Sequence, residues 1–213
     1  MSQQPSLCAE RALWSLGYRY IAGIDEAGRG AWAGPVVAAA VIFPPHYQPP
    51  AEMALVRDSK LLSPRQREAC FEIIARQALA IGVGLTPCRE IDAHGIVPAT
   101  KRAMEEAVQA LATPPEHLLI DALRLEALPL PQRAIIKGDR MCLSIAAASI
   151  IAKVTRDRWM AALDDQRPGY GFAAHKGYGT AKHRLALALH GPSEAHRRTF
   201  APIRALLESH GDD

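Results

Sequence analysis

Four acidic residues follow apolar segments of the chain. Asp25 and Glu26 come directly after YIAGI, Asp121 follows HLLI, and Asp139 follows AIIKG. Carboxylates that converge at strand ends repel one another and raise each other's pKa unless a cation neutralises them. Mg²⁺ and Mn²⁺ prefer oxygen ligands, and a pair of such ions can activate a water and stabilise the leaving oxygen of a phosphodiester. The pattern therefore predicts a two-metal hydrolytic site; strand-end caps and scattered surface acids are the alternative interpretation.

Asp25 and Glu26 raise a geometric question, because successive side chains of a regular strand point to opposite faces. We expect the strand to end or twist at this pair, with Ala27-Gly28 as the break. Alternatively, Glu26 contributes its backbone carbonyl as well as, or instead of, its side chain.

The segment GIDEAGRG has glycines at a spacing that resembles a phosphate-binding loop. It does not fit that motif, because Arg29-Gly30 stands where Lys and then Ser or Thr are required. Two acids in the loop would repel a bare phosphate, whereas they suit a metal ion that itself meets the phosphate. The glycines are then expected to let the backbone approach a ligand closely.

Strands interleaved with helices must position these residues. Apolar runs predict strands, and helical periodicity with a capping box at Ser63 predicts helices. The expected strands are 18–25, 34–43, 81–87, 117–125 and 133–139, and the expected helices are a short one near 7–16 and those at 63–80, 98–111, 144–165, 180–190 and 200–209. This alternation predicts an α/β fold with a central mixed sheet flanked by helices.

Composition fits one globular domain: the chain has 213 residues, of which 49% are hydrophobic and 22% charged. The net charge of +3 is uneven, since residues 1–139 hold 14 basic and 15 acidic residues (−1) and residues 140–213 hold 11 and 7 (+4). A basic second half gives mild support for phosphate binding. The four cysteines form no metal-binding pair, and we see neither a signal peptide nor a membrane span, so a cytoplasmic protein with free thiols is expected.

Many segments together resemble type 2 ribonuclease H, the ribonuclease HII family. They are GIDEAGRG, GPVVAAAVI, DSKLLS, EID, LLIDALRL, KGD, SIAAASIIAKVTRD, YGFAAHKGYGT and HRRTF, in this order over nearly the whole chain. The resemblance implies a ribonuclease H-like fold with a small C-terminal helical part, in one domain over 1–213 whose catalytic core is about 19–178 and whose helical part is about 179–213.

The resemblance also implies a function and a set of site residues. The enzyme would cleave the RNA strand of RNA–DNA hybrids and nick duplex DNA at embedded ribonucleotides, leaving a 3′-hydroxyl and a 5′-phosphate. Asp25, Glu26, Asp121 and Asp139 map onto the family carboxylates, which bind two Mg²⁺ or Mn²⁺ ions, one preparing the attacking water and the other stabilising the departing oxygen. Substrate-binding positions map onto Gly28, Arg29 and Gly30, which would sense the 2′-hydroxyl, onto Tyr178, which would pack on the sugar at the ribonucleotide junction, and onto Ser59 and Lys60, which would contact phosphate.

Other residues admit two interpretations. Ala31-Trp32 stands where the family usually has proline and leucine, and Trp32 either stacks on substrate or packs beneath the loop. Lys153, Arg156 and Asp157 form either an exposed ion-pair face or a shell behind the site. A duplex-binding surface, or generic basic surface, would include His175, Lys176, Lys182, Arg184, Arg197 and Arg198.

Two rival functions remain at this point. Another two-metal nuclease of the same fold, such as a junction resolvase or a type 3 ribonuclease H, shares the acids, although a DNA-only resolvase has no use for a 2′-hydroxyl sensor. A binding module without catalysis would use the basic second half and would not need Asp25 or Asp121. The family leads us to expect a monomer.

Overall fold

The computed structural model describes residues 4–209 and contains one five-stranded sheet of order β3-β2-β1-β4-β5. The strands are β1 (Ile21–Ala27), β2 (Val36–Ile42), β3 (Ala80–Thr86), β4 (His117–Asp121) and β5 (Gln132–Ile135). β1 pairs antiparallel with β2 and parallel with β4, so the predicted mixed sheet is confirmed. Because β1 and β4 run in the same direction, their carboxyl ends meet at one edge of the sheet.

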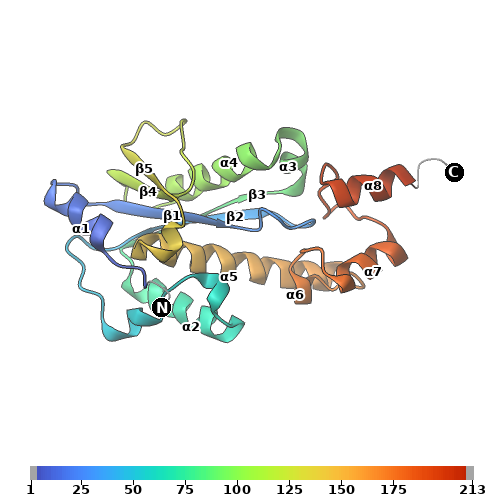
Figure 1. Ribbon diagram of the computed structural model, residues 1–213, viewed down its shortest axis with the longest axis horizontal. Helices are drawn as coiled ribbons and strands as arrows, with labels where there is room; N and C mark the ends of the chain where they lie inside the picture. The colour runs from blue at the N-terminus through green and yellow to red at the C-terminus, as the bar shows by residue number, and fades with distance from the viewer. Residues whose placement is uncertain (1–3, 210–213) are drawn as a thin grey trace.

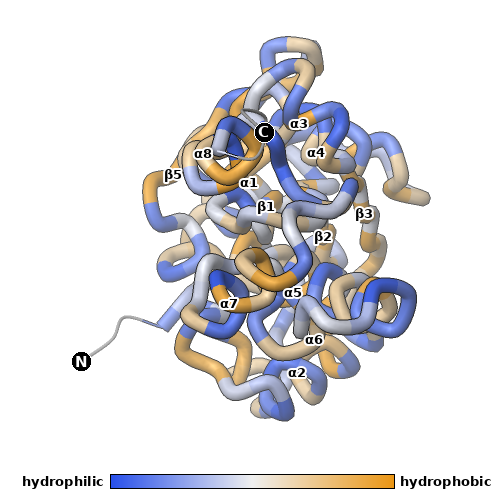
Figure 2. Tube along the Cα trace, turned by 90° about the vertical axis from the view of Figure 1, so that its right-hand side faces the viewer, coloured by the Kyte–Doolittle hydropathy of each residue, from blue (hydrophilic) through white to orange (hydrophobic). Residues whose placement is uncertain are grey.

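Helices cover both faces of the sheet (Figure 1). The longer helices are α2 (Pro64–Gln77), α4 (Ile96–Gln109) and α5 (Leu143–Gln166); the shorter ones are α1 (Cys8–Ser15), α3 (Cys88–His94), α6 (Phe172–His175), α7 (Ala181–His190) and α8 (Ala201–Ser209), with 3-10 turns η1 (Ala51–Leu55), η2 (Ser59–Leu61) and η3 (Gly138–Arg140). Viewed along the long axis, the strands lie between α4 and α5, with α2 beyond α5 (Figure 2).

Two apolar cores follow from the alternation of side chains along the strands. Ile21 and Ala39 face α5 and join one buried cluster, while Ile24 and Ala38 face α4 and join the other. Small residues allow close packing: a Cβ on Gly23 would lie 2.2 Å from the main-chain carbon of Ser144 in α5. The alanine-rich helix therefore lies directly against the strand that ends in Asp25.

Several boundaries differ from the prediction. The capping box at Ser63 is present, but α2 ends at Gln77 because β3 already begins at Ala80. The expected strand at 133–139 stops at Ile135, and Asp139 lies in the short turn η3 instead. The short helices α3 and α6 were not predicted, because seven and four residues carry too little periodicity to be recognised.

Candidate active site

The strands bring Asp25 and Asp121 together as predicted. The β1–β4 ladder ends with Ile24 opposite Ile120, so the next residue on each strand is one of these acids. Asp25 lies on the face covered by α5 and is buried, and Asp121 is half-buried at the end of β4. Asp121 Oδ1 accepts a 2.8 Å hydrogen bond from the Gly138 N–H, which ties η3, and with it Asp139, to the same edge.

Asp25 is held in an electrostatically unfavourable place. Burial raises its pKa well above the usual value, and the negative charges of Glu26 and Asp121 add to that rise. Hydrogen bonds from the Glu26 N–H, at 2.7 Å, and from Ser149 offset part of it. No cation is among the chief influences on the Asp25 pKa, although the charge of Asp25 helps to raise the pKa of Lys60.

Glu26 follows Asp25 without an interruption of the strand. The ladder with β2 continues through Glu26↔Ala38 to Ala27↔Val37, and β1 ends at Ala27, so the strand runs through the pair itself and breaks at Ala27-Gly28 as expected. The two carboxylates consequently start from opposite faces. Burial raises the Glu26 pKa; Arg29, 3.3 Å from Glu26 Oε1, counteracts that rise, and Glu26 Oε2 is buried without a hydrogen-bond partner.

Asp139 is buried in η3 and lies beside both negative and positive groups. Burial and the charge of Asp58 raise its pKa, while Lys60, whose Nζ lies 3.7 Å from Asp139 Oδ2, lowers it. Burial alone would lower the Lys60 pKa, but four nearby carboxylates, Asp139 foremost, raise it overall. The Lys60 side chain is 78% exposed and is therefore available to a substrate phosphate as well.

Asp58 lies in DSKLLS but is not among the site residues predicted from the sequence. It is buried, accepts a hydrogen bond from the Lys60 N–H at 3.0 Å, and accepts another from Arg140 Nε at 3.1 Å. The side chain therefore shapes the turn that presents Lys60 to the site. Its position as the acid directly before Ser-Lys was the available signal, since Asp commonly caps such turns.

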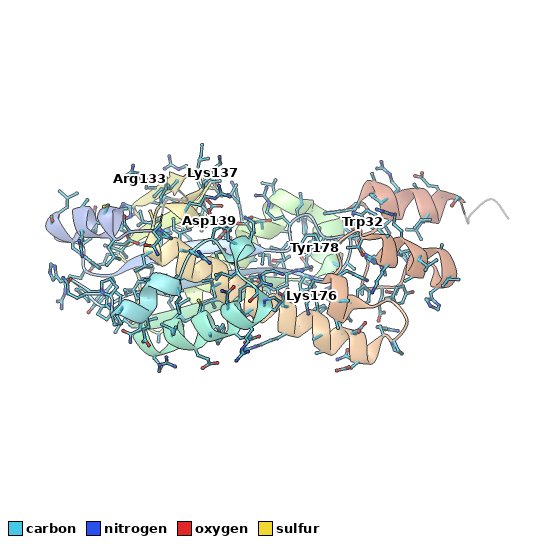
Figure 3. All side chains as sticks on the ribbon, turned by 60° about the horizontal axis from the view of Figure 1, so that its bottom comes forward. Trp32, Arg133, Lys137, Asp139, Lys176 and Tyr178 are labelled. Carbon is cyan, nitrogen blue, oxygen red and sulfur yellow. The ribbon has the colours of Figure 1, made fainter. Side chains whose placement is uncertain are left out.

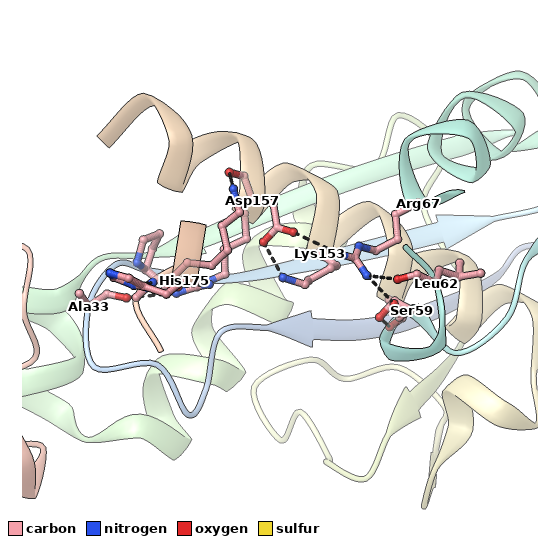
Figure 4. A network of polar contacts seen from close by, with 12 residues as sticks. Ala33, Ser59, Leu62, Arg67, Lys153, Asp157 and His175 are labelled. Carbon is pink, nitrogen blue, oxygen red and sulfur yellow. Dashed lines mark hydrogen bonds and ion pairs between the residues drawn. The ribbon is translucent and has the colours of Figure 1, made fainter. Parts of the chain in front are cut away.

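Ser59 points inward. Its hydroxyl is buried and lies 2.9 Å from the hydroxyl of Ser149, the residue that also hydrogen-bonds Asp25. Arg67 donates to the Ser59 carbonyl at 2.9 Å and lies 3.8 Å from Asp157, which in turn pairs with Lys153 (Figure 4). This half-buried network braces the turn that carries Ser59, so Lys153 and Asp157 form an ion pair in the shell behind the site and not an exposed face.

The glycines after the acids form a tightly held loop. Gly28 has φ +97°, and a Cβ there would lie 2.0 Å from Arg156 Nε, so both the backbone conformation and the space require glycine. Gly30 differs: a Cβ there would meet nothing within 4 Å, and the residue is exposed. The backbone at Gly30 is thus open to a ligand.

Two buried arginines hold this loop by its carbonyls. Arg197 donates to the carbonyls of Gly28 (2.7 Å), Arg29 (2.8 Å) and Gly34 (2.8 and 3.0 Å). Arg156 donates to those of Pro35 (2.9 Å), Ala33 (3.1 Å) and Lys176 (2.9 Å). Neither arginine has exposed surface, so placing Arg197 on a duplex-binding surface is wrong. An arginine inside a run of basic residues gives no sequence signal of burial.

Tyr178 lies next to Arg156, one of the two arginines that hold the glycine loop. Its ring is 37% exposed, with the Arg156 guanidinium 5.5 Å from the ring centroid. In Figure 3, Asp139 lies between Arg133 and Lys137 on one side and Tyr178, Lys176 and Trp32 on the other.

Trp32 packs beneath the loop. A Cβ on Gly179 would lie 2.1 Å from the indole, and the ring centroid lies 5.7 Å from that of His183, while the main-chain N–H of Trp32 donates to the Gly177 carbonyl at 2.8 Å. The packing interpretation is therefore the correct one. Of the other suggested duplex contacts, His175 is also buried, whereas Lys182, Arg184 and Arg198 are exposed.

The donor set fits hard divalent cations, since all four side chains offer carboxylate oxygens and one of these, Glu26 Oε2, is buried without a partner. Within residues 4–209, no three His, Cys, Asp or Glu side chains already form a ready-made cage for an ion. The two observations agree, because Mg²⁺ is commonly held by one or two carboxylates and completed by waters and substrate phosphates.

A mixed sheet with acids at the adjoining ends of β1 and β4, covered by a long helix, defines a nuclease of the ribonuclease H-like class. Comparisons of the sequence specify it further. The ribonuclease HII family profile matches residues 22–203. Ribonuclease HII of Roseiflexus castenholzii is 58% identical over 93% of this chain and 89% of the relative, and that of Chloroflexus aurantiacus is 57% identical over 95% and 97%. The chain belongs to the ribonuclease HII family.

Solved structures agree in fold. Ribonuclease H2 of Pyrococcus horikoshii superposes with a TM-score of 0.74 at 27% identity, over 91% of this chain and all of that one. Ribonuclease HII of Archaeoglobus fulgidus, solved as a complex with PCNA, gives 0.68 at 29% identity over 85% and 95%. The predicted ribonuclease H-like fold is thereby confirmed. No helix within residues 4–209 is long and apolar enough to cross a membrane.

Proposed function

We propose that Asp25, Glu26, Asp121 and Asp139 form the catalytic centre and that the loop 28–30 with Tyr178 selects the ribonucleotide. As a ribonuclease HII, the chain is a metal-dependent endoribonuclease that acts on RNA–DNA hybrids. The finer proposal is that it also nicks duplex DNA at single embedded ribonucleotides and leaves a 3′-hydroxyl and a 5′-phosphate. The observation that carries the proposal is the convergence of carboxylates around Asp25, whose pKa is raised by burial and by the charges of Glu26 and Asp121, beside an open glycine backbone.

The four carboxylates would hold the metal, with Glu26 available through its unpartnered Oε2 and through its main-chain carbonyl. Two bound divalent ions supply an activated water and stabilise the leaving oxygen. We propose Mg²⁺ or Mn²⁺ as the ions. A type 3 ribonuclease H of the same fold was solved with Mn²⁺, but at 23% identity its metal is a property of that protein.

The chain's own residues would orient the substrate. The exposed Gly30 backbone can approach the 2′-hydroxyl, which is the local difference between RNA and DNA. Arg29 (40% exposed) and Lys60 (78%) offer cations to the phosphates. Ser59 would act indirectly, because its hydroxyl contacts Ser149 and through it supports Asp25.

We further propose that residues 1–213 work as one monomeric unit with a core at about 19–178 and a helical part at about 179–213, of which 210–213 lie outside the described residues, as do 1–3. Arg197 supports this unity, because it hydrogen-bonds loop carbonyls 163 to 169 positions earlier. All four cysteines are free thiols, which suits a reducing compartment, and we propose a cytoplasmic location.

The test is nicking of duplex DNA that contains one ribonucleotide, in Mg²⁺ and in Mn²⁺. Asp121→Asn should lower kcat by about 10³-fold, because metal ions contribute several kcal/mol to such reactions. Asp165→Asn, at an exposed acid of α5, is the matched control and should keep wild-type rates. Undiminished cleavage by a folded Asp121→Asn protein would overturn the proposed centre and favour the non-catalytic binding module.

All-DNA duplex and a long RNA–DNA hybrid are the comparison substrates. Cleavage of the all-DNA duplex at a similar rate would favour a resolvase-like nuclease over a ribonuclease H. Cleavage of the long hybrid without nicking at the single ribonucleotide would leave the catalytic centre intact and remove the proposed junction recognition.

A further inference from the structure

Three buried histidines lie together beneath the Tyr178 segment. His175 comes from α6, His183 from α7, and His196 from the segment before α8; all three are less than 9% exposed. The rings of His175 and His183 stack with centroids 4.3 Å apart and planes 14° from parallel. His183 Nε2 and His196 Nε2 are 3.0 Å apart. None of these groups has a part in the chemistry proposed above.

The hydrogen bonds define which ring nitrogen of each histidine carries the proton. The Ser193 N–H donates to His196 Nδ1 at 2.9 Å, so His196 carries its proton on Nε2 and donates it to His183 Nε2. His183 then carries its proton on Nδ1 and donates to the Tyr178 carbonyl, 3.1 Å away. Each link has one donor and one acceptor, so His196 and His183 form a directional chain of neutral rings.

His175 completes the arrangement from the other side of Tyr178. The Gly177 N–H donates to His175 Nδ1 at 3.2 Å, and His175 Nε2 donates to the Tyr170 carbonyl at 2.7 Å. Histidine side chains therefore hydrogen-bond the backbone at the Gly177 N–H and at the Tyr178 carbonyl. Gly177 has φ +79°, and a Cβ there would lie 2.4 Å from the Ala33 oxygen, so this backbone also lies against the glycine loop.

His196, at the far end of the chain of hydrogen-bonded histidines, is also connected to the glycine loop. His196 directly precedes Arg197, whose guanidinium holds the carbonyls of Gly28 and Arg29. One short C-terminal segment therefore anchors both the glycine loop and, through His183, the backbone of Tyr178. Recognition of the junction requires the glycine loop and Tyr178 to be held in a fixed position relative to each other.

We propose that His183, supported by His196 and His175, is a positioning residue that fixes Tyr178 for recognition of the ribonucleotide junction. This inference rests on the proposed role of Tyr178. The neutrality of the rings supports it: burial, together with the proximity of His175 to His183 and of His183 to His196, lowers the pKa of both His183 and His196 to about 4, so the donor–acceptor pattern is intact at neutral pH.

The primary experiment uses a matched pair at position 183. The amide of His183→Asn can still donate to the Tyr178 carbonyl, whereas His183→Leu fills similar space without a donor. On duplex DNA with one ribonucleotide, we expect kcat/KM to fall about tenfold for His183→Leu and no more than about twofold to threefold for His183→Asn, since a lost hydrogen bond of about 1 to 1.5 kcal/mol corresponds to such factors. Thermal unfolding verifies that each variant is folded.

A double-mutant cycle separates positioning from general loosening. If His183 acts through Tyr178, adding His183→Leu to Tyr178→Ala should cause no further loss beyond that of Tyr178→Ala alone. Independent, multiplicative losses would overturn the inference, as would equal losses for His183→Leu and His183→Asn. A normal rate for Tyr178→Ala would instead remove the proposed role of Tyr178 itself.

His196 gives a second test that does not depend on folding of the His183→Leu protein. His196→Gln keeps a donor near the position of Nε2, while His196→Met does not. We expect kcat/KM to fall for the methionine variant, by about threefold to tenfold, and to be nearly preserved for the glutamine variant. Wild-type rates for a folded His196→Met protein would contradict the proposal.

Discussion

The carboxylate cluster differs from the buried residues His183, His196 and Arg197, which form the segment that holds the glycine loop. Buried polar groups are poorly paired in the cluster and well paired in this segment. Around Asp25, like charges lie close together, pKa values are raised, and Glu26 Oε2 has no partner. Around Arg197 and His183, each buried donor named above meets a carbonyl or a ring nitrogen. The first region is destabilised as long as no cation is bound, whereas the second is rigid before any ligand arrives.

This difference matches the ligand proposed for each region. A divalent cation offsets the repulsion among carboxylates. Repulsion in the free protein therefore makes binding of the ion more favourable. Recognition of a 2′-hydroxyl depends on backbone groups within hydrogen-bond distance, and a loop fixed in advance loses little entropy on binding. The predictions below test this contrast by removing one region's partners and relieving the other region's repulsion.

The largest effect is expected from Arg197→Met. The carbonyls of Gly28, Arg29 and Gly34 would lose a donor in a buried place, at a combined cost of about 3 to 5 kcal/mol. Tm should fall by about 10 °C, by the scaling for a chain of this size. Arg198→Met, at the exposed neighbouring position, is the control and should shift Tm by less than about 2 °C. Equal shifts in differential scanning calorimetry would show that the carbonyl contacts contribute little.

An effect of comparable size is expected from acid. His183 and His196 have folded pKa values of about 4 against an unfolded value near 6.5, so below pH 6.5 the unfolded chain takes up protons that the folded chain does not. Their stabilisation is complete above pH 6.5 and is lost as pH falls toward 4, by about 1.4 kcal/mol per pH unit for each histidine. The raised pKa values of Asp25, Glu26 and Asp139 act oppositely, because these groups bind protons more readily when folded.

Urea unfolding in EDTA between pH 7 and 5 measures this dependence. His196→Gln should reduce the slope of unfolding free energy against pH by the contribution of about one proton. The same slope in the wild type and in His196→Gln would mean that His196 binds protons equally in the folded and unfolded chains, which contradicts a lowered pKa.

The same contrast explains what the sequence could and could not predict. The acids were found because they end apolar strands, and strand pairing then places Asp25 beside Asp121. Arg197 and His183 were not recognised as buried, since nothing in HRRTF or in AKHRLALALH separates a buried polar side chain from an exposed one. Their burial depends on which carbonyls the tertiary fold leaves without partners, and local periodicity carries no information about that.

The smallest effect has the opposite sign to that of Arg197→Met. Asp25→Asn removes a buried negative charge that Glu26 and Asp121 repel, while an amide can still accept the hydrogen bond from the Glu26 N–H. In EDTA we expect Tm to rise by about 2 to 4 °C, which corresponds to about 1 kcal/mol for a chain of this size. Addition of Mg²⁺ should raise the Tm of the wild type and leave that of Asp25→Asn nearly unchanged, because the variant lacks one carboxylate ligand. A lower Tm for Asp25→Asn in EDTA would mean that the hydrogen bonds of Asp25 outweigh its repulsion, and the carboxylate cluster would then be as well satisfied as the segment that holds the loop.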